Sequence, residues 1–179
     1  MRLILLNLTL LIFISSCDNS NMKYTIEWSK EIKEKIIKDA NQQPDKTVLD
    51  TATHQLTLYK GDIKLKYFML RPKWDSLTNK IISVDTLVSI FYSTDQSFEL
   101  VRELCPAIER SFEGIRYKGD HLGLAEFRFC DGKLKEQGCR FDGNVGIWRE
   151  WDENGKVIKE KDYGKSEKLG GLKDIKYSR

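Results

Sequence analysis

The feature that most constrains the fold of this chain is an internal repeat in its C-terminal half. The segment Glu113–Gly119 returns as Gln137–Gly143, so that equivalent positions such as Gly114 and Gly138 are 24 residues apart. Half of that period, about 12 residues, accommodates one short strand and one turn but is too short for a pair of helices. The repeat therefore predicts a series of β-hairpins.

Turn dipeptides separate the strands predicted in this region. Asp131-Gly132, Asp142-Gly143 and Asn154-Gly155 tolerate positive φ at both central positions, as tight type I′ hairpin turns require. Segments rich in aromatic and branched residues lie around them, at 124–129, 138–141, 148–151 and 157–163. We therefore predict an antiparallel β-meander of repeated hairpins.

The segment Gly146–Val157 resembles the MORN-repeat variant, whose units have the pattern G-x-W-x-x-[YF]-x-x-N-G-x-[LVI]. Gly146, Trp148, Asn154-Gly155 and Val157 match that pattern, with Trp151 at the position of its Tyr or Phe, whereas the preceding unit departs from it in the placement of its aromatics. The resemblance extends over the C-terminal unit, residues 98–179. Many bacterial proteins with such repeats carry an antitoxin or immunity label, and others are scaffolds or membrane-associated modules. The resemblance thus implies interaction rather than catalysis.

The N-terminus predicts a secreted, lipid-anchored protein. Arg2 precedes an apolar run, Leu3–Ile14, which is shorter than the roughly 20 residues of a transmembrane helix and suits a signal peptide. The small residues before Cys17 resemble a bacterial lipobox, which implies alkylation of the Cys17 thiol with diacylglycerol, cleavage after residue 16 and acylation of the new amino terminus by a fatty acid such as palmitate. An ordinary cleaved signal peptide is the alternative. We expect residues 17–22 to form a lipidated tether in the cell envelope, with the membrane and leaflet left open.

The net charge of the chain and the distribution of its charged residues argue against a nucleic-acid partner. Removing residues 1–16 from the 179-residue chain leaves 163 residues, with 29 basic and 27 acidic side chains. Lysine and glutamate alternate along the predicted strands and form no basic stripe. A solvated sheet face explains this pattern.

Three cysteines remain in addition to Cys17. Cys105 and Cys130 occupy corresponding turn positions in successive units, yet two strand steps separate them. Those steps amount to about 9.5 Å, and a disulfide needs Cα atoms within about 7 Å. We therefore expect free thiols at Cys105, Cys130 and Cys139, while leaving open that one pair is oxidised. No C-x-x-C motif indicates a metal or redox site.

The N-terminal unit, residues 23–97, is predicted to combine one amphipathic helix with antiparallel strands. Ser29 offers an N-cap to a helix over 30–41, preceded by a short strand over 24–28. The helix places an apolar stripe on one face and i,i+4 ion pairs on the other, and we expect the stripe to pack against the sheet. The stripe consists of Ile32, Ile36, Ile37 and Ala40.

The remaining N-terminal segments alternate as strands do. We predict strands over 47–49, 55–59, 63–70 and 82–92, with a turn at 60–62 and a loop at 71–76. The apolar residues within 97–104 are spaced as in one turn of a helix. Residues 101–104, however, align with 148–151 in the repeat, so we predict a strand over 97–104. The fold class expected for the whole chain is α+β, mainly β.

Candidate catalytic and metal-binding groups are sparse. His54 and His121 have no partner at metal or triad spacing, and no catalytic or phosphate-loop motif occurs. Glu150, Asp152 and Glu153 cluster at a turn but fall short of a 12-residue calcium loop, which favours a solvated turn. We therefore expect no enzymatic activity, no cofactor and no metal.

Aromatic residues of the repeat are the candidates for partner binding, although most are expected to form buried cross-strand pairs. Trp148 and Trp151 are three residues apart and point to opposite faces of a regular strand, so at least one faces outward. The candidate binding residues are Trp148, Trp151 and Tyr163.

Two functions remain open. The first is a membrane-tethered module that binds one protein partner, of which an immunity protein is one form, and an exposed sheet edge would favour it. The second is an envelope structural or lipid-contacting protein without a dedicated partner, which a basic face and the Lys-rich tail 165–179 would favour. The oligomeric state is not predicted.

Overall fold

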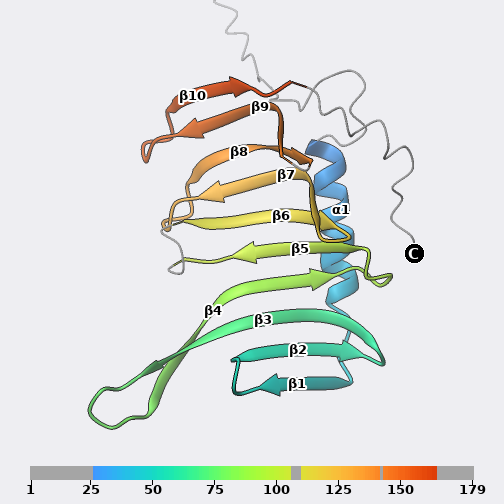
Figure 1. Cartoon of the computed structure of the whole chain (residues 1–179), viewed down its shortest axis with the longest axis vertical. Helices are drawn as coiled ribbons and strands as arrows, with labels where there is room; N and C mark the ends of the chain where they lie inside the picture. The colour runs from blue at the N-terminus through green and yellow to red at the C-terminus, as the bar shows by residue number, and fades with distance from the viewer. Residues whose placement is uncertain (1–25, 106–109, 142, 165–179) are drawn as a thin grey trace, which may run out of the picture.

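The computed structural model describes residues 26–105, 110–141 and 143–164, which form one helix and one ten-stranded sheet. The strand order follows the chain from β1 to β10 and the paired strands are antiparallel (Figure 1), so the predicted meander of the α+β, mainly β class is confirmed. The signal peptide and tether predicted for 1–22 lie outside the described residues. The elements are α1 (Ile26–Ala40), β1 (Lys46–Asp50), β2 (Gln55–Lys60), β3 (Ile63–Trp74), β4 (Ile81–Tyr92), β5 (Phe98–Glu103), β6 (Ser111–Tyr117), β7 (Asp120–Arg128), β8 (Leu134–Phe141), β9 (Asn144–Trp151) and β10 (Val157–Asp162).

Helix α1 crosses one face of the sheet, roughly at right angles to the strands (Figure 1), and packs across β3, β4, β5 and β7. Its predicted apolar stripe is confirmed, since Ile32, Ile36 and Ala40 are buried. Ile32 and Ile36 meet Phe98 and Leu100 of β5 in a core cluster. This cluster joins the N-terminal unit to the repeat.

The helix begins earlier than predicted, at Ile26, so the strand expected over 24–28 is wrong where the structure describes it. The physical reason is that Trp28 lies one i+4 step before Ile32, and its ring packs against Phe98 with a centroid distance of 6.4 Å. Ser29 is consequently inside the helix instead of capping it. Its hydroxyl oxygen accepts a hydrogen bond of 2.9 Å from the backbone N–H of Leu124 and so fixes the helix to β7.

A row of small residues runs across the sheet on the face opposite α1. Val101 of β5 is paired with Gly114 of β6, Gly114 with Ala125 of β7, and Ala125 with Gly138 of β8. Because directly paired residues share a face, these four positions form a shallow strip across four strands. The prediction of a strand over 97–104 is confirmed by β5, which contributes Val101 to this strip.

Aromatic rings fill the space above the small residues. Phe112, Phe127 and Trp148 are only 4–6% exposed although the sheet has no second helix among the described residues. Phe112 and Phe127 contact each other at 4.9 Å between ring centroids, and the guanidinium of Arg140 lies over all three rings at 5.3–5.9 Å. The rings thus shield this face themselves, with an arginine above them.

This packing explains the glycine of the repeat. A Cβ atom on Gly114 would lie 2.5 Å from the ring of Phe112, and one on Gly138 would lie 2.3 Å from the ring of Trp148. Both distances are below van der Waals contact, so any side chain here would displace a ring. The period of 24 residues therefore places a glycine under an aromatic ring in β6 and again in β8.

Strands β3 and β4 extend further than predicted, and the loop expected at 71–76 is wrong for its first part. Pro72 is paired with Val84 inside the β3–β4 ladder. Strand β2 pairs with β3 only as far as Met69, so at Pro72 one side of β3 has no neighbour and the missing N–H breaks no hydrogen bond. The strand continues through the proline to Trp74.

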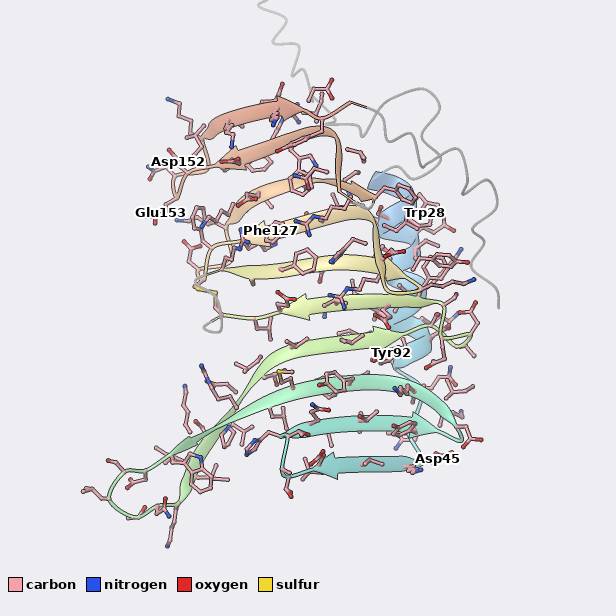
Figure 2. The ribbon with its side chains drawn as sticks, viewed as in Figure 1. Trp28, Asp45, Tyr92, Phe127, Asp152 and Glu153 are labelled. Atoms are coloured by element: carbon pink, nitrogen blue, oxygen red, sulfur yellow. A yellow bond between two sulfur atoms is a disulfide. The ribbon has the colours of Figure 1, made fainter. Side chains whose placement is uncertain are left out.

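The expectation of free thiols is also wrong. Cys105 and Cys130 form a disulfide with their Cα atoms 5.6 Å apart, and Cys139 is not a free thiol either. The spacing argument failed because it assumed that both residues stay in register with the strands. They lie instead in the connections after β5 and β7, where the chain can bend across the end of β6 (Figure 2).

We predict that Gly138→Ala lowers the free energy of unfolding by about 2 kcal/mol, since the new methyl group collides with the indole of Trp148. Urea unfolding followed by circular dichroism measures the loss. In a Trp148→Leu background the same substitution should cost much less, because the collision partner is absent. Equal costs in the two backgrounds would contradict the proposed packing.

Candidate functional site

A hairpin arm, residues 71–85, projects beyond the body of the sheet (Figure 1). It is the segment of β3 and β4 that lies past the last residues paired with β2 and β5, at Met69 and Val88. Among the described strands, its two strands are paired only with each other. The arm is therefore a two-stranded ribbon, a structure that is only marginally stable in water without packing.

The arm is amphipathic. Trp74 is paired with Ile81 and Pro72 with Val84, and Pro72 and Trp74 are two residues apart on β3, so these apolar side chains share one face; an irregularity of the ladder between Lys73 and Trp74 accommodates the extra residue of β4. Trp74, Ile81 and Val84 are each 52–53% exposed. Large apolar side chains so placed form a contiguous surface with no covering layer among the described residues.

Charged residues occupy the other face of the arm. Asp85 forms ion pairs with Arg71 at 3.3 Å and with Lys73 at 3.0 Å. The hydrogen bond from Lys73 is the main cause that lowers the pKa of Asp85. These cross-strand pairs keep the two strands in register and leave the apolar face free for contacts.

The turn at the end of the arm has a defined structure. One carboxylate oxygen of Asp75 accepts hydrogen bonds of 2.8 Å from the backbone N–H groups of Leu77 and Thr78, and these bonds lower the pKa of Asp75. Asn79 takes the positive φ that closes the turn. Leu77, 94% exposed, is the one apolar residue in this otherwise polar tip of 75–80.

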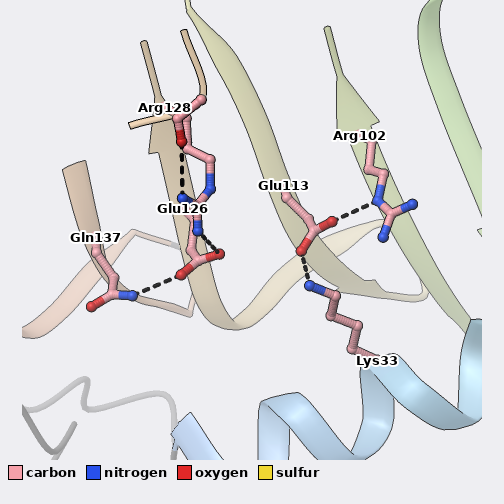
Figure 3. A network of polar contacts seen from close by, with 7 residues as sticks. Lys33, Arg102, Glu113, Glu126, Arg128 and Gln137 are labelled. Carbon is pink, nitrogen blue, oxygen red and sulfur yellow. Dashed lines mark hydrogen bonds and ion pairs between the residues drawn. The ribbon is translucent and has the colours of Figure 1, made fainter. Parts of the chain in front are cut away.

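A second polar cluster lies beside α1, where a groove of about 330 Å³ is bordered by charged side chains (Figure 3). Glu113 of β6 accepts hydrogen bonds from Lys33 of α1 and, at 2.5 Å, from Arg102 of β5. Next to it, Glu126 accepts hydrogen bonds from Arg128 at 3.2 Å and from Gln137 at 2.8 Å.

The charges of this groove are used internally. Burial is the largest influence on Glu113 and opposes its ionisation, but the hydrogen bonds and charges of Lys33 and Arg102 together outweigh it and lower the pKa of Glu113. A carboxylate held by two cations anchors the helix to the sheet. Because each of these charged groups already has a partner, the groove serves the fold better than it would bind a charged ligand.

The three aromatic residues predicted to bind a partner differ in exposure. Trp148 is buried, and its indole N–H donates a 3.0 Å hydrogen bond to the carbonyl of Cys139. Trp151 is half-buried and lies on the other face of β9 by alternation. Tyr163, just after β10, is 42% exposed and its ring contacts Trp148 edge-on at 6.5 Å. Only Trp151 and Tyr163 are thus accessible to a partner.

Residues considered for chemistry lie far apart. His54 is in the turn between β1 and β2, whereas His121 is on β7, five strands away and thus at least about 20 Å distant. Asp152 and Glu153 lie in the β9–β10 turn (Figure 2), where Asp152 accepts hydrogen bonds from the backbone N–H groups of Asn154 and Lys156, and Glu150 lies just before them in β9. In the described ranges no group of three His, Cys, Asp or Glu residues could hold a metal ion.

Sequence reasoning did not identify the arm, although a signal was present. Pro72 and the turn-forming residues after Trp74 suggested a loop, while the apolar residues at 81, 82 and 84 were assigned to an ordinary strand. The alternation of Pro72 and Trp74 with Arg71 and Lys73 was the available sign of a two-faced ribbon.

No family model, no curated protein and no solved structure matches this chain. Within the residues that the structure describes, no helix has the length and apolar character needed to cross a membrane.

We predict that stability falls as the pH drops from about 6.5 to 4 because of His121. Burial first, and then the charges of Arg116 and Arg140, lower its pKa to about 4, whereas the unfolded chain binds the proton near the ordinary value of 6.5. As the pH falls, the unfolded state therefore binds a proton before the folded state does, which lowers the free energy of unfolding. Because the imidazole is half-exposed, solvent screens its interactions, and we expect the free energy of unfolding to fall by only about 1 kcal/mol.

Urea unfolding at pH 7 and pH 5 tests this assignment in the wild type and in His121→Phe, which retains a ring against Phe112. Carboxylates titrate alike in both proteins, so the histidine accounts for the difference between them. The wild type should lose more stability than the variant. Identical losses would show that His121 does not titrate as described.

Proposed function

We propose that this chain is a bacterial lipoprotein, anchored through Cys17, that acts as a non-enzymatic protein-binding module in the cell envelope. The observation that carries the binding role is the apolar face of the arm, where Trp74, Ile81 and Val84 are half-exposed on a ribbon held in register by ion pairs. Interface cores are more apolar than the rest of a protein surface and are enriched in aromatic side chains such as that of Trp74. An immunity or antitoxin role is one form of this function.

The chemistry of the arm favours a folded protein over the lipid bilayer as its partner. A segment that inserts into a bilayer needs an apolar tip, but here Asp75 is ionised and Ser76, Thr78, Asn79 and Lys80 surround Leu77. The apolar residues lie along the flank of the ribbon instead. Such a flank fits side-on packing against a hydrophobic surface of another protein.

The anchoring role rests on the lipobox at residues 14–17 and on the short distance between Cys17 and α1, which starts at Ile26. Several acyl chains hold a protein at a membrane durably, because each buried methylene contributes about 0.8 kcal/mol. The arm and the open sheet would then face the aqueous side of that membrane.

We predict that Cys17→Ser abolishes incorporation of labelled palmitate and moves the protein from the membrane fraction to the soluble fraction or leaves it unprocessed. Metabolic labelling and fractionation of cells that express the full chain measure both effects. Ser16→Ala, which keeps a small residue before the cysteine, is the control and should be labelled normally. Labelling of the Cys17→Ser variant would contradict the lipobox assignment.

A protein partner bound by the arm should be captured by in-cell crosslinking of the full chain in its own host. We expect one stoichiometric protein, identified by mass spectrometry and crosslinked to residues 71–85. Trp74→Ser combined with Ile81→Ser should reduce its yield at least tenfold, because the centre of the apolar face is lost.

Val157→Thr is the matched control, since Val157 is also an exposed strand residue but lies on β10. It should leave capture unchanged, and thermal unfolding should show that all variants are folded. Recovery of only lipids and abundant envelope proteins would replace the binding module with a structural envelope protein.

A further inference from the structure

Strand β1 is an open edge of the sheet. It is paired with β2 on one side, and no described strand lies on its other side, so its outward backbone N–H and C=O groups are unpaired within the described sheet. All five of its residues are exposed, including Val48 at 42% and Leu49 at 57%. Such an edge is a template for adding a further strand.

The sequence of β1, Lys-Thr-Val-Leu-Asp, is complementary to itself in the antiparallel sense. When two copies are aligned about Val48, Val48 lies opposite Val48 and Thr47 opposite Leu49. Lys46 of each copy then lies opposite Asp50 of the other. Opposite charges directly across an antiparallel pair attract and like charges repel, so the two ends of the strand select this register.

We propose that two copies of this chain join edge to edge through β1, which produces one continuous antiparallel sheet across a two-fold axis. This interaction is separate from the partner binding assigned to the arm. An isologous contact of this kind closes on itself, so it yields a dimer and no filament through this edge.

The rest of the fold permits this contact. A two-fold axis perpendicular to the sheet leaves both helices on the same face, yet α1 packs across β3, β4, β5 and β7 and leaves β1 uncovered. The two helices are therefore kept apart by the outermost strands of both copies. The turn at 51–54 is held by the carboxylate of Asp50, which accepts the N–H groups of Ala52 and Thr53.

The opposite edge of the sheet, β10, is less suited to the same contact. Its ladder with β9 has an irregularity between Val157 and Lys159, and bulges of this kind discourage further pairing. Lys159 and Glu160 already form ion pairs with Glu150 and Arg149 of β9. Self-pairing of β10 about its centre would also place Ile158 opposite Lys161. Of the two edge strands, β1 is therefore the one better suited to pair with a second copy of itself.

A joint of five residues per copy is small beside standard interfaces of about 1,200–2,000 Å², so the test must detect a weak dimer. The substitution Val48→Cys provides such a test, because in the proposed dimer the two cysteines face each other on the two-fold axis at the distance that a disulfide needs. The full-length variant, in cells and after extraction in mild detergent, is exposed to a gentle oxidant and analysed by non-reducing electrophoresis. Ile158→Cys on β10 is the matched control and is more exposed, at 62%.

We expect Val48→Cys to be trapped as a dimer at least tenfold faster than Ile158→Cys. Equal or slower trapping would overturn the proposal, since chance collisions would explain it. The comparison is specific to the edge because Cys105 and Cys130 are bonded to each other, and Cys139, only 1% exposed, is present in both variants.

Charge reversal tests the register. In the Val48→Cys background, Lys46→Asp places aspartates opposite each other and Asp50→Lys does the same with lysines, so each alone should reduce trapping about tenfold. An equimolar mixture of these two variants restores both opposite-charge pairs and should be trapped as a heterodimer at nearly the original rate. This rescue excludes a folding defect, including loss of the turn at 51–54 that the Asp50 carboxylate holds, and its failure in variants whose thermal unfolding matches that of Val48→Cys would contradict the register. Capture of a partner by the arm should be unchanged throughout.

Discussion

The central constraint on this structure is that a single sheet has two faces to bury and only one described helix to cover them. Helix α1 shields one face through the stripe of Ile32 and Ile36. On the other face, rings of Phe112, Phe127 and Trp148 lie over small residues and exclude water without a second layer. Each ring buries apolar surface on the order of 150–250 Å², which compensates for the absence of a covering helix.

The polar interactions follow from this arrangement. The helix runs across the strands, so its contacts with any one strand are short and need reinforcement at several points. Ser29 binds the backbone of β7, and Lys33 reaches Glu113, which Arg102 also holds. On the opposite face Arg140 covers the rings, and burial together with the neighbouring charge of Arg110 lowers its pKa. The charged side chains of the sheet therefore act mainly within the fold.

Local patterns in the sequence predicted the features that are locally determined. The repeat and its turn dipeptides indicated the hairpins, and the isoleucine spacing indicated the helix and its buried face. Non-local effects decided the rest: Trp28 extends the helix because Phe98 receives it, Pro72 stays in a strand because no neighbour needs its N–H, and Cys105 reaches Cys130 beyond the strand ends. The arm was missed for the same reason, since its exposure depends on where β2 and β5 end.

An open meander also determines where a partner can bind. The central strands are covered by α1 on one face and by their own rings on the other, which buries most of their apolar side chains. Among the described residues, most of the exposed large apolar side chains lie instead on β1, on and just after β10, and on the arm between β3 and β4, with Ile147 of β9 as an exception. Burial is highest across β5 to β7, where the two core clusters overlap, whereas all residues of the edge strands β1 and β10 are exposed. Recognition by this fold therefore belongs to its periphery, where backbone edges and an amphipathic ribbon remain accessible.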